Sequence, residues 1–173
     1  MIRSLKTATL LPFFRRLLEA KLTINSIKIQ TQDFDFGKEV DKLEANNVSD
    51  GALVTFVGRV RDKNDGCNVN TLFLEHYPGM TEQCLLDITN QARQRWSLGN
   101  ISVIHRIGEL NLGEKIVFVG VTSMHRQDAF AASEFIMDYL KVKAPFWKKE
   151  QTEQGERWVE AKQKDQKEAN KWS

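Results

Sequence analysis

The sequence predicts an α+β fold with a largely antiparallel sheet, and two observations carry this prediction. Segments rich in β-branched and aromatic residues alternate with amphipathic segments, in the order strand pair, helix, strand pair, helix. No glycine-rich phosphate-binding loop joins a strand to a helix. The common nucleotide-binding folds are therefore not favoured.

The first predicted elements are short. Residues 24–29 carry isoleucines that indicate a strand, and residues 36–43 carry apolar side chains at helical spacing. Residues 51–61, GALVTFVGRVR, alternate with a period of two, which is typical of a strand. A turn-rich stretch, DKNDGCN, leads from there into VNTLFLEHY, a second strand. These two strands are predicted to form a hairpin.

The period changes to that of a helix in the segment that follows. Its apolar stripe predicts a helix with Thr81 as its N-cap and Gly99 as its stop. Two strands, ISVIHRI and KIVFVGVTS, are predicted on either side of a turn, GELNLGE. A helix over DAFAASEFIMDYLK comes next and ends before Pro145. The tail is predicted to be a helix or ordered arm that docks through Trp158.

Composition excludes several classes of protein. The 173 residues include 25 basic and 23 acidic side chains, a formal net charge of +2, which does not support extensive nucleic-acid binding. Cys67 and Cys84 belong to no metal-type spacing, and a zinc site is not expected. No apolar run approaches the roughly 20 residues of a membrane span. We therefore expect a cytoplasmic protein with reduced thiols, no metal and no membrane partner.

The N-terminal residues differ from the rest of the chain. Residues 1–22 are basic and nearly free of acids, with several leucines and phenylalanines. That composition has some likeness to an organelle transit peptide or an interfacial helix. We favour a poorly ordered extension with no role in the fold, so that residues 23–173 form a single domain.

Cationic side chains fall at the ends of the predicted elements, where sites collect: Arg61, His125, Arg126, Lys141 and Lys148. Such a group suits an anionic ligand, and the exposed N–H groups of a helix start favour one too. Lys141 lies at the far end of the helix that His125 and Arg126 begin. It can join them only through a neighbouring subunit or through curvature of the fold. An alternative explanation for Lys141 is that it complements the helix dipole.

Five motifs resemble one known family closely, and they occur in the right order from about Ser49 to Trp172: TLFLEHYPGMTE, VIHRIGEL, IVFVGVTSMHR, FIMDYLKVKAPFWKKE and ERWVEAK. The family is the large, catalytic subunit of molybdopterin synthase. The resemblance implies an α/β-hammerhead-like fold. It also implies the conversion of cyclic pyranopterin monophosphate (precursor Z) into molybdopterin, within molybdenum cofactor biosynthesis.

The resemblance further implies a partner and an assembly. Two sulfurs would come from the thiocarboxylated C-terminus of a small ubiquitin-like subunit. A homodimer of large subunits would form the centre of a heterotetramer, with a small subunit at each end. The large subunit of this family uses no metal or organic cofactor.

The motifs also imply roles for individual residues. Lys141 and Lys148 resemble the catalytic lysines. The substrate-binding candidates are Arg59, Arg61, His125, Arg126, Lys149, Glu150 and Lys162. Arg61 is favoured over Arg59, and Lys149 has the alternative role of a solvated neighbour. At Lys162 the family often has arginine, and a lysine there supplies the charge without the bidentate fork.

Two other functions remain as alternatives. A non-catalytic module could dock the ubiquitin-like carrier without converting the pterin, although such a module has no need for both Lys141 and Lys148. A small RNA-binding domain would need a stronger basic excess and exposed aromatic residues between the basic ones.

Overall fold

The structure is a computed structural model, and it describes residues 23–160 and 163–173. The predictions for residues 1–22 and for Lys162 lie outside these ranges. The helices are α2 (Phe36–Glu44), α3 (Met80–Arg95), α4 (Arg126–Lys143) and α5 (Gln163–Asn170). The strands are β1 (Asn25–Gln30), β2 (Ala52–Arg59), β3 (Lys63–Asn64), β4 (Cys67–His76), β5 (Leu98–Arg106), β6 (Gly108–Asn111), β7 (Lys115–Ser123), β8 (Phe146–Thr152) and β9 (Gly155–Val159).

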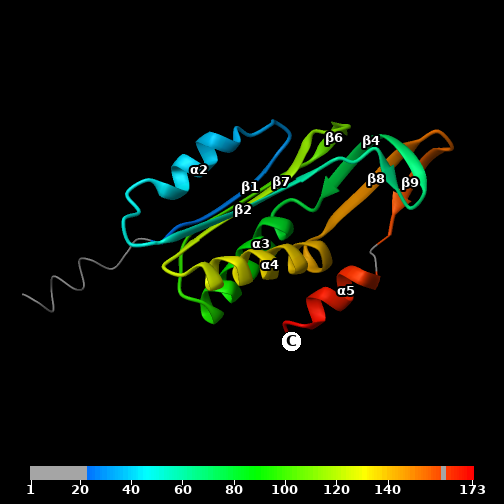
Figure 1. Cartoon of the computed structure of the whole chain (residues 1–173). Helices are drawn as coiled ribbons and strands as arrows, with labels where there is room; N and C mark the ends of the chain where they lie inside the picture. The colour runs from blue at the N-terminus through cyan, green and yellow to red at the C-terminus, as the bar shows by residue number, and fades with distance from the viewer. Residues whose placement is uncertain (1–22, 161–162) are drawn as a thin grey trace, which may run out of the picture.

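The strands form two sheets. The first has the order β1-β5-β7-β2, and only its β1–β5 pair is parallel. In the second, β4 pairs with β3, β6 and β8, and β8 pairs with β9, all antiparallel. Figure 1 shows α2 on one face of the first sheet and α3 and α4 on the other, with the second sheet at one end. The predicted α+β class with largely antiparallel sheets is confirmed.

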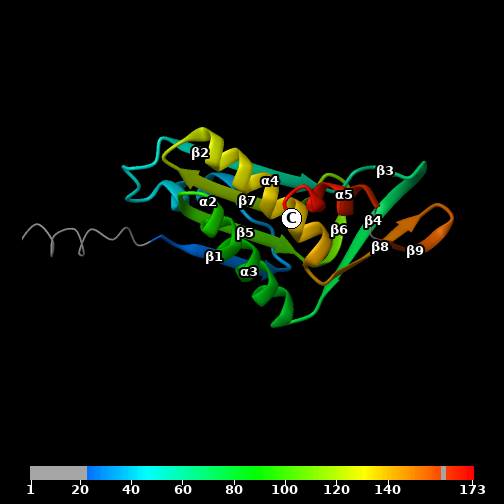
Figure 2. The same ribbon diagram turned by 90° about the horizontal axis from the view of Figure 1, so that it is seen from below.

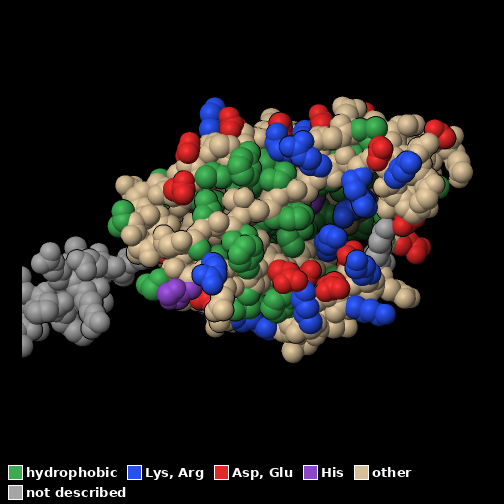
Figure 3. Space-filling model, viewed as in Figure 1, with side chains coloured by type: hydrophobic (Ala, Val, Ile, Leu, Met, Phe, Trp, Pro, Cys, Tyr) green, Lys and Arg blue, Asp and Glu red, His purple; other side chains and the backbone are tan. Residues whose placement is uncertain are grey.

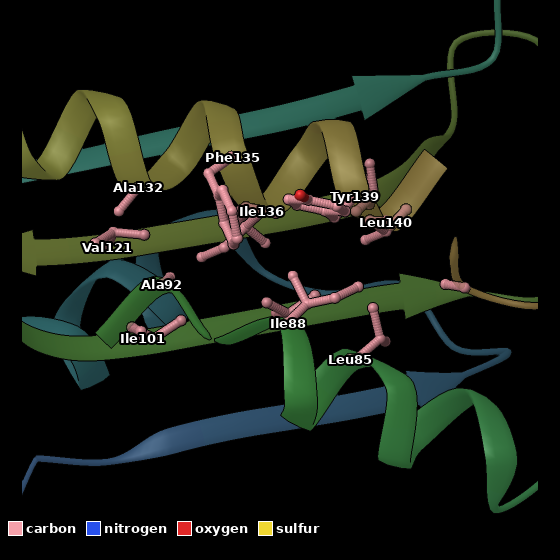
Figure 4. Packing of buried hydrophobic residues seen from close by; sticks show 14 residues of the cluster. Leu85, Ile88, Ala92, Ile101, Val121, Ala132, Phe135, Ile136, Tyr139 and Leu140 are labelled. Atoms are coloured by element: carbon pink, nitrogen blue, oxygen red, sulfur yellow. The ribbon is translucent and has the colours of Figure 1, made fainter. Parts of the chain in front are cut away.

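The main core lies between the first sheet and the helices α3 and α4. Leucine and isoleucine side chains of α3 meet alternate residues of β5 and β7, such as Ile101 and Val121 (Figure 4). Phe135 of α4 is fully buried there. On the opposite face, α2 and the loop before it cover Ile104 and Phe118. That residues 23–173 form one domain stays a prediction, which is supported by Ile116 packing against the clusters of both sheets.

The predicted hairpin of residues 51–61 with VNTLFLEHY is wrong. β2 pairs with β7, whereas β4 belongs to the second sheet. The register of β2 shifts between Gly58 and Arg59, and the chain then leaves the first sheet. The tight hairpin here is β3–β4, whose turn residues Asp65 and Gly66 both have positive φ. An Asp-Gly pair favours that turn, because both of its central positions need positive φ.

Other local predictions are also corrected. Helix α3 starts after Gly79, while the buried Thr81 hydroxyl donates to the Tyr77 carbonyl instead of capping the helix. Gly99 lies inside β5 and not at a helix end. GELN forms strand β6 and not a turn. Trp158 is 55% exposed, and the tail docks through Trp172 instead.

Candidate functional site

Chain topology brings candidate cations of β2 and α4 to one end of the first sheet. Because β2 and β7 are antiparallel, Arg59 pairs with Lys115 at the start of β7. Helix α4 leaves the other end of β7 and runs back across the sheet, so its last turn lies at the same end of the first sheet as the end of β2 (Figures 1 and 2). Lys141 in that last turn and Arg61, two residues beyond β2, therefore share this end. Lys148 follows on β8, directly after the bend at Pro145.

The Lys141 side chain is 44% exposed and has an acidic neighbour. Its Nζ lies 3.3 Å from Oδ1 of Asp165 in α5. Lys143, the last residue of the helix, places its Nζ 3.6 Å from the centroid of the Tyr139 ring. Figure 3 shows Lys and Arg side chains gathered where α4 gives way to β8, next to acidic side chains. No role is predicted for Asp165 from the sequence, because only the fold brings α5 to this place.

Lys148 stands on the inner face of the second sheet. It pairs in register with the buried Leu74 of β4 and with Val159 of β9. Phe146 shares this face, and its ring stacks on His105 with the centroids 3.8 Å apart. His105 is buried, as expected for a structural histidine. The aromatic stack thus supports the start of the strand that carries Lys148.

Burial is the main reason that the pKa of His105 is lowered to about 3, and the charges of Lys148 and His76 also lower it. The hydrogen bond with the Arg106 carbonyl acts in the opposite direction. In the unfolded chain the pKa of a histidine is about 6.5. Between these values the unfolded state binds a proton that the folded state does not, so the free energy of unfolding must fall as the pH falls. The loss attributable to His105 between pH 7 and pH 5 is about 2 kcal/mol.

We expect His105→Gln to remove this part of the pH dependence. Urea unfolding of both proteins at pH 7 and pH 5 measures it, and His125→Gln is the control at an exposed histidine in another part of the fold. If the parent and His105→Gln lost equal stability on acidification, His105 would not be the group responsible.

The other predicted residues near this end have different surroundings. Arg59 donates from Nη1 to the Gly113 carbonyl at 3.2 Å. Lys149 lies on the outer face of the second sheet, opposite to Lys148, and its Nζ is 2.8 Å from Glu156. Glu150 is buried, and its carboxylate accepts hydrogen bonds from Arg157 and Asn64. The structure therefore does not group Lys149 and Glu150 with Lys141.

His125 and Arg126 lie at the opposite end of α4. His125 is its N-cap residue but makes no side-chain capping hydrogen bond. The helix is continuous from Arg126 to Lys143. At 1.5 Å per residue, Arg126 and Lys141 are about 22 Å apart along the axis. Curvature of the fold does not bring them together, so within one chain these cations form two separate groups.

No metal centre is evident in the described part of the chain, where no three His, Cys, Asp or Glu side chains are grouped to hold an ion. Within residues 23–160 and 163–173, Cys67 and Cys84 are free thiols. None of the helices in these ranges has the length and apolar character needed to cross a membrane. The chemistry available at the α4–β8 end is that of amines, a guanidinium and a carboxylate.

Comparisons with known proteins agree on one family. The family model described as MoaE protein matches residues 29–143. The molybdopterin synthase catalytic subunit of Escherichia coli (strain K12) is 58% identical over 146 residues, which cover 84% of this chain and 97% of that protein. The corresponding protein of Pseudomonas aeruginosa is 56% identical over 147 residues, covering 85% of this chain and 98% of the relative.

A solved structure supports the same assignment. The molybdopterin biosynthesis MoaE protein of Burkholderia ambifaria superposes with a TM-score of 0.74 at 48% identity, covering 86% of this chain and 98% of the other. The fold and these relatives thus define an α+β enzyme subunit of cofactor biosynthesis. The chain belongs to the MoaE protein family.

Proposed function

We propose that this chain is the catalytic subunit of a molybdopterin synthase. It converts cyclic pyranopterin monophosphate to molybdopterin with two sulfurs from the thiocarboxylated C-terminus of a small ubiquitin-like subunit. The observation that supports the proposal is that Lys141 at the end of α4 and Arg61 after β2 lie at one end of the first sheet, with Lys148 following on β8, in a chain of the MoaE family. The partner is the small subunit of the synthase.

The chemistry of both ligands fits cationic side chains. The pterin carries a phosphate, and the tail of the small subunit ends in a thiocarboxylate. A charge pair 4 Å apart is worth about 4 kcal/mol at an effective dielectric constant of about 20. Arg61 supplies a fixed positive charge with a bidentate fork, whereas an amine can also give and take a proton.

Lys141 is the proposed proton-transferring group. Each transfer forms a carbon–sulfur bond between the thiocarboxylate and the pterin, and water then cleaves the acyl–sulfur bond, so that the tail leaves as a carboxylate. Protons have to move in these steps. A positioned side chain that moves such protons contributes a factor of about 10²–10⁴ to a rate. Lys148 lies just beyond the bend after α4 and is the second catalytic candidate.

We also propose that two copies of the chain complete each site. His125 and Arg126 are about 22 Å from Lys141 along one helix, too far to act on the same small ligand. A two-fold axis that sets two α4 helices antiparallel would bring these residues of one copy to Lys141 of the other. The homodimer at the centre of a heterotetramer meets this requirement. Lys162 is proposed to reach the neighbouring site as well.

The remaining candidate residues differ in their structural surroundings. Arg59 is retained as a substrate-binding candidate, because it lies at the same end of β2 as Arg61. Lys149 and Glu150 are disfavoured as substrate-binding residues. Lys149 lies on the outer face of the second sheet, and the Glu150 carboxylate already forms an ion pair with Arg157. We place the reaction in the cytoplasm, where the free thiols of Cys67 and Cys84 would stay reduced.

Formation of the dithiolene tests the proposal. The purified chain, the thiocarboxylated small subunit and cyclic pyranopterin monophosphate are combined, and molybdopterin is quantified. We expect product only with all three components, and none when the small subunit ends in an ordinary carboxylate. Tight binding of the small subunit without any product would contradict the proposal and indicate a non-catalytic docking module.

A further inference from the structure

We propose that Asp165 is the counter-ion of Lys141 in the empty site, and that an anionic ligand must displace it to reach the lysine. Asp165 would then be a positioning residue that sets how strongly the site binds anions. The inference rests on the proposed role of Lys141. It gives Lys141 a counter-ion from α5, a helix for which the sequence predicts no function.

The geometry of the pair is that of an exchangeable ion pair. Oδ1 of Asp165 lies 3.3 Å from Nζ of Lys141, and the two side chains are 27% and 44% exposed. A partly exposed pair of this kind stabilises a protein only weakly, because water screens both charges. A dianionic phosphate or the end of a peptide tail can therefore replace the single carboxylate at small cost.

The helix that carries Asp165 is held in place at its far end. Ala169 is buried, and the Trp172 ring packs edge-on against Trp96 and Phe135. The indole Nε1 of Trp172 donates to Asp138 at 2.8 Å. These contacts join α5 to α4, the helix of Lys141, so the Asp165 carboxylate is presented to the lysine by an anchored element.

The other acidic residues of this region are engaged elsewhere. Lys171 lies within 3.2 Å of carboxylate oxygens of Glu134, Asp138 and Glu168. Glu168 thus sits on the same helix as Asp165 but pairs with a lysine outside the proposed site. This difference provides a matched control with the same change of charge.

A simpler explanation is that Asp165 only complements the dipole of α5, since it lies in the first turn of that helix. Under that explanation, Asp165→Asn would weaken the helix slightly and leave anion binding unchanged. Under the counter-ion proposal, the same substitution makes the site bind anions more tightly. The two explanations therefore differ in the sign of a measurable effect.

The experiment is calorimetric titration of the full chain with inorganic phosphate at low ionic strength. We expect Asp165→Asn to bind phosphate about two- to fivefold more tightly than the parent, the range that corresponds to a partly exposed ion pair. Asp165→Glu should restore the parental affinity. Glu168→Gln should bind like the parent. In a Lys141→Ala background the effect of Asp165→Asn should disappear, which shows that it acts through the lysine.

An unchanged phosphate affinity in Asp165→Asn, or no detectable phosphate binding by either protein, would overturn the inference. An equal gain in Glu168→Gln would also overturn it, because the effect would then be one of overall charge. The readout needs neither pterin nor small subunit. A failure here is therefore distinguishable from a failure of the proposed synthase activity, which the dithiolene assay measures separately.

Discussion

Lys141→Ala is expected to lower the rate of dithiolene formation by a factor of about 10²–10⁴, the range in which a positioned proton-transferring side chain contributes. The methyl group of alanine can neither move a proton nor balance the charge of an anionic ligand. Lys141 is partly exposed at the end of α4, so its loss leaves no cavity in the core. The substitution should therefore affect the reaction and not the fold.

Lys143→Ala is the matched control for this prediction. Lys143 lies in the same last turn of α4, but its amine is 3.6 Å from the Tyr139 ring centroid and has no role in the proposed site. Single-turnover rates of the parent and both variants, with the binding of the small subunit measured in parallel, make the comparison. Full activity in Lys141→Ala would move the chemistry to Lys148 or elsewhere.

Phe135→Ala is expected to lower the free energy of unfolding by about 3–5 kcal/mol, as large-to-small changes of buried aromatic residues do. Phe135 is fully buried, and its ring centroid lies 4.5 Å from that of Tyr139 and 5.5 Å from that of Trp96. It also contacts Trp172, which anchors the C-terminal tail. Its removal should therefore loosen α5 as well as the core.

Urea unfolding at neutral pH measures this loss, and Phe130→Ala is its control. Phe130 lies on the same helix, but 62% of its surface is exposed, so the same chemical change should cost about 0.5 kcal/mol or less. A loss of less than about 1 kcal/mol in Phe135→Ala would be inconsistent with a close-packed core at this point.

Local periodicity predicted the long helices, because each of them has one buried face. The central strands β5 and β7 were predicted from their runs of β-branched residues, which are buried on both faces of the sheet. The pairing of β2 with β7 was not predicted, because an alternating apolar pattern indicates a strand but does not show which other strand it pairs with. Strands β8 and β9 were missed as well, because charged residues lie on both faces of the second sheet, with Lys148 and Glu150 on the inner face and Lys149 on the outer one, so no apolar alternation indicates these strands. Trp158 and Trp172 look alike in sequence, and only the packing of α5 on α4 distinguishes the exposed ring from the docked one.

The candidate site was predicted in part. Element ends and the family resemblance pointed to Lys141 and Lys148, and the spacing of α4 already showed that His125 and Arg126 lie too far away. Asp165 carries no signal in a single sequence, because a mixed-charge tail has many equivalent acids. Only the three-dimensional placement of α5 gives this carboxylate a partner.

Lys141 of one copy is proposed to act with Arg126 of another, and mixed dimers test this arrangement. Lys141→Ala and Arg126→Ala chains carrying different affinity tags are co-expressed, and the dimers that carry both tags are isolated. One of their two sites is then intact, so dithiolene formation should recover to about half of the parental rate, although each variant alone is nearly inactive. A mixed dimer as inactive as either variant would contradict a site shared between two copies.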